Sequence, residues 1–165
     1  DDDGYLSITD RKKDLIKTSG GKFIAPQPIE NSFKANVFVG EAAVMGDRRK
    51  FASVLIVPNF AVLEEWARTH DIAFSTRREL VRAPQVRALY QGIVDELNNN
   101  LAQYEKLKKF LLLAEELSVA DGTLTPSMKL RRRHLEQRYH KQIEALYAEE
   151  HAPSKGERVV EQTRR

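Results

Sequence analysis

Residues 37–57 read VFVGEAAVMGDRRKFASVLIV, which is two apolar runs separated by the polar segment 46–50. The runs, Val37–Met45 and Phe51–Val57, each have the length of a single strand. Glycine, aspartate and three basic residues between them are typical of a turn, and they exclude a continuous buried segment. This stretch predicts an antiparallel strand pair joined by a polar turn.

Helical patterns flank the strand pair on both sides. Pro26 and Pro28 lead into a helix that we expect to end near Lys34, because proline is tolerated in a first helical turn. Asn59 can cap a second helix that extends to about His70. After a polar connection, a third helix is predicted by apolar residues at i, i+3, i+4 and i+7 spacing, namely Val86, Leu89, Tyr90, Ile93, Val94, Leu97 and Leu101.

Short segments near both ends complete the predicted fold. Tyr5–Ile8 alternates and can pair with Asp14–Lys17 as a hairpin, while Lys22–Ala25 reads as extended. Phe110–Ala114 reads as a third strand. A last amphipathic helix is marked by Leu135, Tyr139, Ile143, Leu146 and Tyr147. We expect a small α+β domain with a short hairpin and a roughly three-stranded antiparallel sheet flanked by helices.

Composition limits the function classes. With 165 residues and 41% hydrophobic content, the chain can build one core, and no apolar run approaches the ~20 residues of a membrane-spanning helix. The absence of cysteine excludes a disulfide framework, a thiolate metal site and a cysteine nucleophile, and it favours a cytoplasmic protein. A net charge of +3 is weak support for a nucleic-acid partner.

Basic residues gather in two places that are candidate phosphate-facing loops. One contains Arg11–Lys13 with Lys17 and Lys22, and the other contains Lys129 with Arg131–Arg133. The second cluster reads either as a solvated helix start or as a surface for an anion. Because a helix N-terminus already carries partial positive charge, three arginines there favour an anionic partner.

The sequence lacks the common patterns of metal-binding histidines, nucleophilic serines and nucleotide-binding glycine loops. The four histidines are scattered without an i, i+4 pair, and no serine lies in a G-x-S-x-G motif. Ser19–Lys22 is rich in glycine but lacks the spacing of a phosphate-binding Walker loop. From its residues alone, this segment is either an ordinary turn or a place where a ligand approaches the backbone closely.

Two long motifs resemble those of a known superfamily. Residues 3–30, DGYLSITDRKKDLIKTSGGKFIAPQPIE, resemble the hinge and pantetheine-tunnel motif of adenylate-forming enzymes, which include acyl-CoA synthetases, luciferases and peptide-synthetase adenylation domains. Residues 124–133, LTPSMKLRRR, resemble the C-terminal lysine motif in the form found in long-chain fatty acyl-CoA synthetases. The likeness covers residues 1 to about 150.

The resemblance implies a mobile C-terminal domain. Residues 1–13 would be the end of the large N-terminal domain and the hinge, residues 14–150 the mobile domain, and residues 151–165 a disordered tail. Such enzymes join a carboxylic acid to ATP, release pyrophosphate and pass the acyl group to coenzyme A. Between the two steps the C-terminal domain rotates and presents another face to one active site.

The resemblance also implies roles for the residues that match the adenylation motifs. Lys129 matches the lysine that contacts the reacting carboxylate and the α-phosphate. Lys13 matches the hinge residue. Arg11 matches a residue that hydrogen-bonds the ribose, and Asp10 precedes it in the same nucleotide-binding segment.

In the thioester-forming state, Ser19, Gly20 and Gly21 match the loop that lies against the pantetheine arm. A side chain at Gly20 would obstruct that tunnel. Lys22 matches a basic residue near the nucleotide of coenzyme A, and Lys17 matches a lysine that approaches the active site after rotation.

The expected partners are the N-terminal domain of the same enzyme, fatty acid, ATP and coenzyme A, with Mg²⁺ held by the N-terminal domain and none by this chain. Alone, the chain should be inactive. Fatty substrates favour peripheral association with a membrane, whereas nucleic acid is not expected. Two alternatives stay open: a stand-alone basic module that binds nucleic acid or an acidic protein, and a fatty acyl-AMP ligase domain that delivers to a carrier protein.

Overall fold

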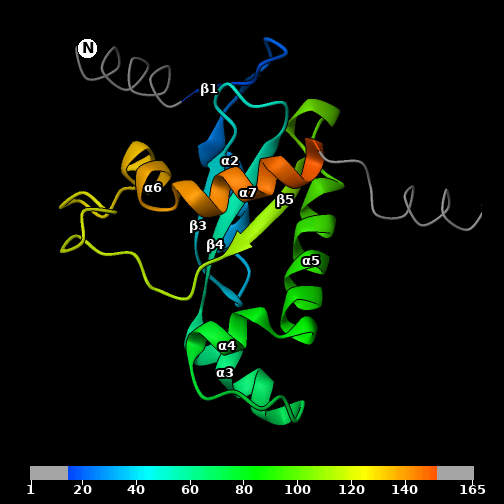
Figure 1. Ribbon diagram of the computed structural model, residues 1–165, viewed down its shortest axis with the longest axis vertical. Helices are drawn as coiled ribbons and strands as arrows, with labels where there is room; N and C mark the ends of the chain where they lie inside the picture. Colours follow the sequence, from blue (N-terminus) through cyan, green and yellow to red (C-terminus); the bar gives the residue numbers. More distant parts are fainter. Residues whose placement is uncertain (1–14, 152–165) are drawn as a thin grey trace, which may run out of the picture.

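The computed structural model describes residues 15–151, which form one three-stranded sheet covered by helices (Figure 1). The strands are β3 (Val39–Met45), β4 (Ala52–Pro58) and β5 (Leu107–Leu112), with β4 in the centre. Every residue of β4 is buried. The predicted strand pair is confirmed, because β3 and β4 are antiparallel and the turn 46–50 joins them.

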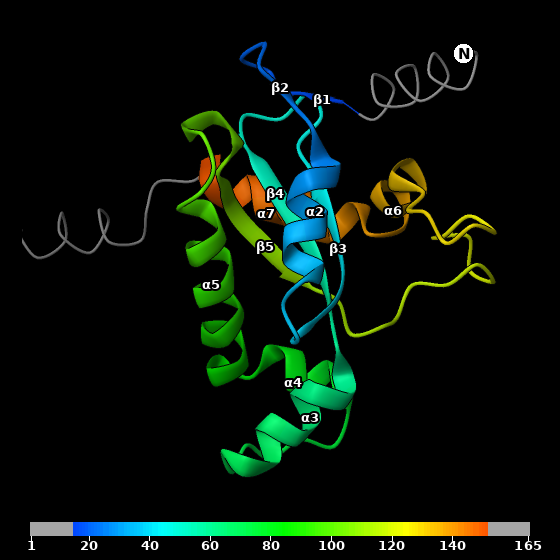
Figure 2. The same cartoon turned by 180° about the vertical axis from the view of Figure 1, so that it is seen from behind.

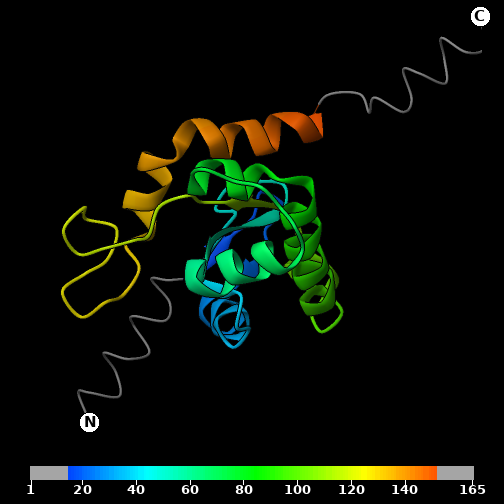
Figure 3. The same cartoon turned by 90° about the horizontal axis from the view of Figure 1, so that it is seen from below.

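Helices cover both faces of this sheet. Figures 2 and 3 show α2 (Pro26–Lys34) and α5 (Pro84–Asn98) on one face and α7 (His140–His151) on the other. The core therefore lies in two layers, one on each side of β4. Helix α5 contributes Val86, Tyr90 and Val94 to it, all on the stripe that the sequence predicts.

The sheet is mixed rather than wholly antiparallel, which corrects one detail of the predicted α+β fold. Strand β5 pairs parallel to β4, with Val54 opposite Phe110. Between these strands the chain passes through α3 (Phe60–Thr69), α4 (Arg77–Arg82) and α5, and this crossover returns it to the end where β4 begins. Apolar periodicity predicts a strand but does not give its direction.

The described part of the chain contains a hairpin before α2 that the sequence pattern does not predict. Strand β1 (Ile16–Lys17) pairs with β2 (Phe23–Ile24), whereas the expected partner, residues 5–8, lies outside the described residues. The amide of Gly21 donates to the carbonyl of Thr18 at 2.9 Å, and Gly21 has a φ of +87°. Glycine tolerates this left-handed conformation, so the chain can reverse within five residues.

The remaining helices differ from the predictions at two points. Asn59 caps α3 as expected, with its side chain accepting from the amide of Val62 at 3.5 Å. The predicted polar connection contains α4, whose N-cap is Thr76. The predicted last helix is two helices, α6 (Arg132–Arg138) and α7, which meet at the buried Tyr139. A single 3₁₀ turn, η1 (Gln103–Glu105), precedes β5.

Candidate active-site loops

The lysine loop, residues 118–131, extends from the body of the domain between β5 and α6 (Figure 1). Leu124 and Leu130 form a β-bridge, and the amide of Thr125 donates to the carbonyl of Lys129 at 2.8 Å. The Thr125 hydroxyl accepts from the amide of Lys129 at 3.1 Å. The loop is thus a small hairpin, and Lys129 is exposed near its tip.

The turn at the tip is closed by its own backbone. The amide of Met128 donates to the carbonyl of Thr125 at 2.8 Å, and Met128 adopts a left-handed φ of +67°. The side chains of Thr125 and Ser127 are hydrogen-bonded at 3.0 Å. These contacts fix the backbone of Lys129 without using its ammonium group, which stays available to a partner.

The base of the lysine loop is fixed by polar contacts around Asp121. Its carboxylate accepts from the amide of Thr123 at 2.9 Å and pairs with Arg138 at 3.0 Å. A hydrogen bond from the Thr123 hydroxyl, with the Thr123 amide and the charge of Arg138, lowers the pKa of Asp121 to about 2. Gly122 has a φ of +84°, and Nε2 of His134 lies 3.1 Å from the carbonyl oxygen of Asp121 at the same base.

The arginine triplet does not form one anion-facing surface. Arg131 and Arg133 are exposed, but Arg132 turns inward and donates to the carboxylate of Glu30 at 2.6 Å and to the carbonyl of Val44 at 2.8 Å. Glu30 is 4% exposed. The expectation of a basic cluster facing a phosphate is therefore wrong for Arg132, because a buried carboxylate on α2 already neutralises it.

The glycine loop, residues 18–22, rests on the β3–β4 turn. The amide of Ser19 donates to the carbonyl of Arg49 at 2.9 Å, and the amide of Arg48 donates to the carbonyl of Lys17 at 2.8 Å. Gly20 is exposed, and a Cβ built on it would meet no atom within 4 Å. The backbone is anchored while the Gly20 face is left open.

Both predicted lysines of this hairpin are exposed and lie near aromatic rings. The ammonium of Lys17 is 5.5 Å from the centroid of Phe23, and that of Lys22 is 5.6 Å from the centroid of Tyr104. Phe23 is itself 56% exposed. The hairpin therefore presents two cations and an apolar ring beside the open glycine face.

Figures 1 and 2 show that the lysine loop and the hairpin leave the domain on different sides. The β1–β2 hairpin brings Lys17, Ser19, Gly20, Gly21 and Lys22 together. The lysine loop, which carries Lys129, lies apart from this hairpin (Figure 1). The predicted hinge and nucleotide-binding segment, residues 10–13, lies outside the described residues.

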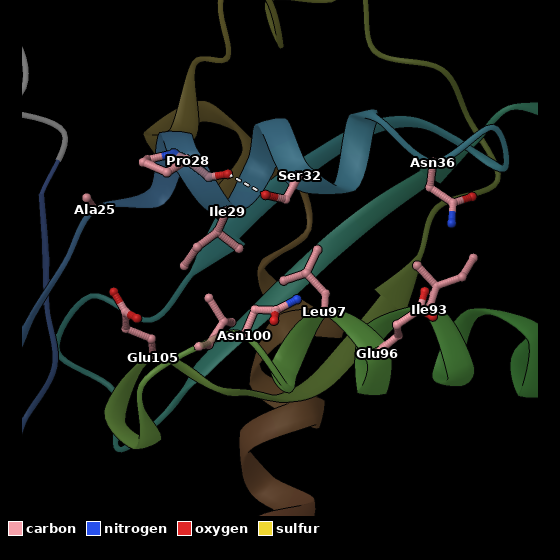
Figure 4. Close-up of a pocket in the computed structure, with 11 residues that line it drawn as sticks. Ala25, Pro28, Ile29, Ser32, Asn36, Ile93, Glu96, Leu97, Asn100 and Glu105 are labelled. Atoms are coloured by element: carbon pink, nitrogen blue, oxygen red, sulfur yellow. Dashed lines mark hydrogen bonds between the residues drawn. The ribbon is translucent and has the colours of Figure 1, made fainter.

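Of two surface grooves, one adjoins a candidate loop and the other does not. The larger, of about 620 Å³, lies between α2 and α5, with Ile29, Ile93 and Leu97 among the residues that line it and neither candidate loop contributing (Figure 4). In the same view Ser32 donates to the carbonyl of Pro28 at 3.1 Å. A second groove, of about 470 Å³, adjoins the lysine loop and includes Met128 in its lining.

Within residues 15–151, no three histidine, aspartate or glutamate side chains gather closely enough to hold a metal ion. In the same part of the chain, no helix is both long enough and apolar enough to cross a membrane.

A comparison with known protein families shows which family the chain belongs to. A family model described as the AMP-binding enzyme C-terminal domain matches residues 13–151. The chain belongs to this family. The resemblance found in the two motifs is thereby confirmed, and the AMP-binding enzyme C-terminal domain accounts for all helices and strands of residues 15–151.

Relatives of the AMP-binding enzyme C-terminal domain include two long-chain-fatty-acid–CoA ligases. The chain is 33% identical over 151 residues to ligase FadD15 of Mycobacterium tuberculosis, which covers 91% of the chain and 25% of the ligase. It is 32% identical over 151 residues to ligase 6 of Mus musculus, which covers 88% of the chain and 21% of the ligase. The chain thus spans about a quarter of the length of the curated relatives it matches.

A solved structure supports the same fold. The adenylation domain of a carboxylate reductase from Mycobacterium chelonae superposes with a TM-score of 0.67 and 26% identity, over 84% of this chain and 20% of that one. The small mixed domain described above is therefore the fold found in an adenylate-forming enzyme.

Sequence reasoning missed the residues that hold the lysine loop in place. Glu30 and Arg132 are 102 positions apart, and neither belongs to a local pattern that pairs them. Asp121 and Gly122 form a turn dipeptide in the sequence, and this pattern does not indicate the contacts of Asp121 with Thr123 and Arg138. The one available signal was the unfavourable arginine triplet, which indicated that an acidic partner was needed.

Proposed function

We propose that residues 14–150 are the mobile C-terminal domain of an ATP-dependent long-chain fatty acyl-CoA ligase. Lys129 would serve the adenylation step, and the glycine loop would serve thioester formation after rotation. The observation that carries this proposal is an exposed lysine at the tip of a hairpin whose backbone is fixed without it. The names of the relatives support the long-chain fatty acid as substrate.

In the adenylation step, a carboxylate oxygen bonds to the α-phosphorus of ATP and pyrophosphate leaves. Two anionic reactants meet, and negative charge gathers on the phosphoryl oxygens. A preorganised cation in a closed cleft stabilises that charge without a protein nucleophile. The ammonium of Lys129 is a compact point charge, and its flexible stem lets it enter and leave the cleft.

In the second step, the thiol of coenzyme A bonds to the acyl carbon and AMP leaves. The fold of this chain does not itself need glycine at position 20, since a Cβ there has free space. We propose that position 20 needs glycine because the pantetheine arm passes along the open face beside Ser19 and Gly21. Lys17 and Lys22 supply positive charge for the approach of the thiol substrate and its phosphates.

The remaining roles rest on the resemblance. Residues 1–13 would end the large domain, with Lys13 as the pivot and with Arg11 and Asp10 at the ribose. By the same resemblance, Mg²⁺ would be bound by the large domain. The chain alone would be inactive, and the complete enzyme would be cytoplasmic, with peripheral access to membranes for its fatty substrate.

A domain replacement tests the adenylation role. This chain would replace the matching quarter of Mycobacterium tuberculosis FadD15, and pyrophosphate release would be measured with palmitate, ATP and Mg²⁺. We expect Lys129→Ala to lower the rate of pyrophosphate release by about 10²- to 10³-fold, the loss typical for one preorganised donor. Thioester formation from supplied acyl-adenylate should stay within about twofold, because Lys129 acts only in the first step.

The control is Lys141→Ala, which removes an exposed lysine of α7 and should leave both steps unchanged. Equal losses in the two steps of the Lys129→Ala protein would contradict the assigned role. A folded replacement protein that binds ATP but releases no pyrophosphate would contradict the proposed function as a whole.

A further inference from the structure

A buried ion pair fixes the point where the lysine loop returns to the body of the domain. Arg132, the first residue of α6, donates through Nη1 to Oε2 of Glu30 at 2.6 Å and to the carbonyl of Val44 at 2.8 Å. Oε2 of Glu30 also accepts from the amide of Val44 at 2.7 Å. The side chains of Arg132 and Glu30 are 19% and 5% exposed. We call these three residues the clamp.

Stability alone is a poor explanation for the clamp. Desolvation of two charges commonly offsets their attraction, so a buried ion pair is often no more stable than an apolar pair of the same size. Burial raises the pKa of Glu30, although the hydrogen bond and the charge of Arg132 oppose that shift. What an ion pair does supply is a defined geometry between the elements that carry it.

The clamp joins three elements at the base of the lysine loop. Glu30 lies on α2, which follows the hairpin of the glycine loop; Val44 lies on β3. Arg132 is three residues after Lys129, and the neighbouring amide of Arg131 donates to the carbonyl of Thr123 at 2.9 Å. The two sides of the lysine loop are therefore tied together just before the point where the clamp attaches them to the core.

A small tilt at Arg132, where the lysine loop joins the domain, produces a larger displacement at the tip of that loop. Three extended residues span about 10 Å, so a tilt of about 10° at Arg132 would shift Lys129 by roughly 2 Å. In enzymes, a misplacement of about 1 Å can cost about 10²-fold in rate. A change in the orientation of the clamp would therefore change where the ammonium of Lys129 is delivered.

We propose that Glu30 and Arg132 are positioning residues for adenylation, which hold the lysine loop at one angle to the core. The proposal rests on the proposed function and deepens it. Neither residue contacts substrate; both act through Lys129. Removing the clamp should lower kcat of the adenylation step, leave KM for ATP and fatty acid unchanged, and spare thioester formation, which uses the other loop.

The test uses the same domain replacement with two variants. Arg132→Met removes the charge, leaves Glu30 buried without its partner, and should lower both Tm and adenylation. The double variant Glu30→Met/Arg132→Met replaces the pair by apolar side chains of similar length and should recover most of the lost Tm. We expect its kcat for pyrophosphate release to remain at least about tenfold below the parent.

Two results would overturn the proposal: normal adenylation in the double variant, and equal losses in both half-reactions. Should the double variant melt early, Val94→Ala in the core face of α5 supplies a matched loss of stability remote from the loop. Equal adenylation loss in that variant at equal Tm would also overturn the proposal, whereas loss only in the clamp variant supports it.

Lys129→Ala in the same assays distinguishes failure of the proposed function from failure of the proposal about the clamp. Adenylation that survives Lys129→Ala ends the proposed function, whatever Arg132 does. Adenylation lost in Lys129→Ala but retained at full rate in the double clamp variant ends only the inference about the clamp.

Discussion

At the scale of single residues, backbone conformation shapes the tips of both candidate loops. Lys129 is held by bonds to its own amide and carbonyl. Met128 tolerates a left-handed φ beside it. In the glycine loop, only Gly21 has a left-handed backbone conformation, so the fold favours glycine at position 21 and not at position 20.

That difference between the two glycines is measurable in the isolated chain. Gly21→Ala should lower the free energy of unfolding by about 1–2 kcal/mol, the cost of a left-handed L-residue. Gly20→Ala should be neutral or stabilising by up to about 1 kcal/mol, since the added methyl meets no atom and the unfolded chain loses freedom. Urea unfolding of both variants checks this, and an equal cost at the two positions would refute it.

The same substitution at Gly20 has a second expected effect in the domain replacement. Gly20→Ala should slow thioester formation from supplied acyl-adenylate and leave pyrophosphate release intact, the reverse of Lys129→Ala. A fall in pyrophosphate release alone would show that the glycine face does not meet the thiol substrate.

Asp121 makes stability depend on pH in a defined window. Its pKa is lowered from 3.8 to about 2 in the folded chain, so the unfolded chain takes up this proton first as the pH falls. The stabilisation is complete above pH 4 and disappears between about pH 4 and pH 2. We expect the Tm difference between the parent and Asp121→Asn to shrink across that window; a difference independent of pH would contradict the assignment.

At the scale of elements, one side chain links α5 to β5. Asn98 donates through Nδ2 to the carbonyl of Leu107 at 3.0 Å and accepts through Oδ1 from the Leu107 amide at 2.9 Å. The side chain of Asn98 thus makes the two hydrogen bonds with Leu107 that a neighbouring strand would make, and it sets where β5 begins. This contact fixes the end of the crossover that makes β5 parallel to β4.

Asn98→Ala should therefore destabilise the domain by about 1–3 kcal/mol, because it leaves two partly buried backbone groups without partners. Asn99→Ala, at the exposed next position, should cost less than about 0.5 kcal/mol. Thermal unfolding of the two variants compares them. Similar losses at both positions would mean that the contact does not define the start of β5.

Elements with a strong local signal could be predicted from the sequence, and those set by long-range contacts could not. The β3–β4 pair, α3 with its Asn59 cap and the stripe of α5 follow from apolar spacing and capping chemistry. The direction of β5 depends on the path of the crossover. The break between α6 and α7 is invisible in the pattern, because Leu135, Tyr139 and Ile143 are all buried across it.

At the scale of the whole molecule, two loops on different sides serve one proposed active site (Figure 1). Both loops could be found in the sequence because each is a continuous motif. The clamp between Glu30 and Arg132 could not, since its partners are 102 positions apart and only the fold brings them together. Under the proposed function each loop would have to be rigid on its own, and the contacts of Asp121 and of Ser19 hold the two loops in place.

The most direct test of this account measures distances by electron paramagnetic resonance in the domain replacement. The chain has no native cysteine, so Ala120→Cys in the lysine loop and Gln27→Cys just after the glycine-loop hairpin can each carry a spin label opposite one label beside the active site of a cysteine-free large domain. With ATP and fatty acid, the label at position 120 should be the nearer one; with acyl-adenylate and coenzyme A, the label at position 27 should be. Two distances that stay the same under both conditions would contradict the alternation of the two loops.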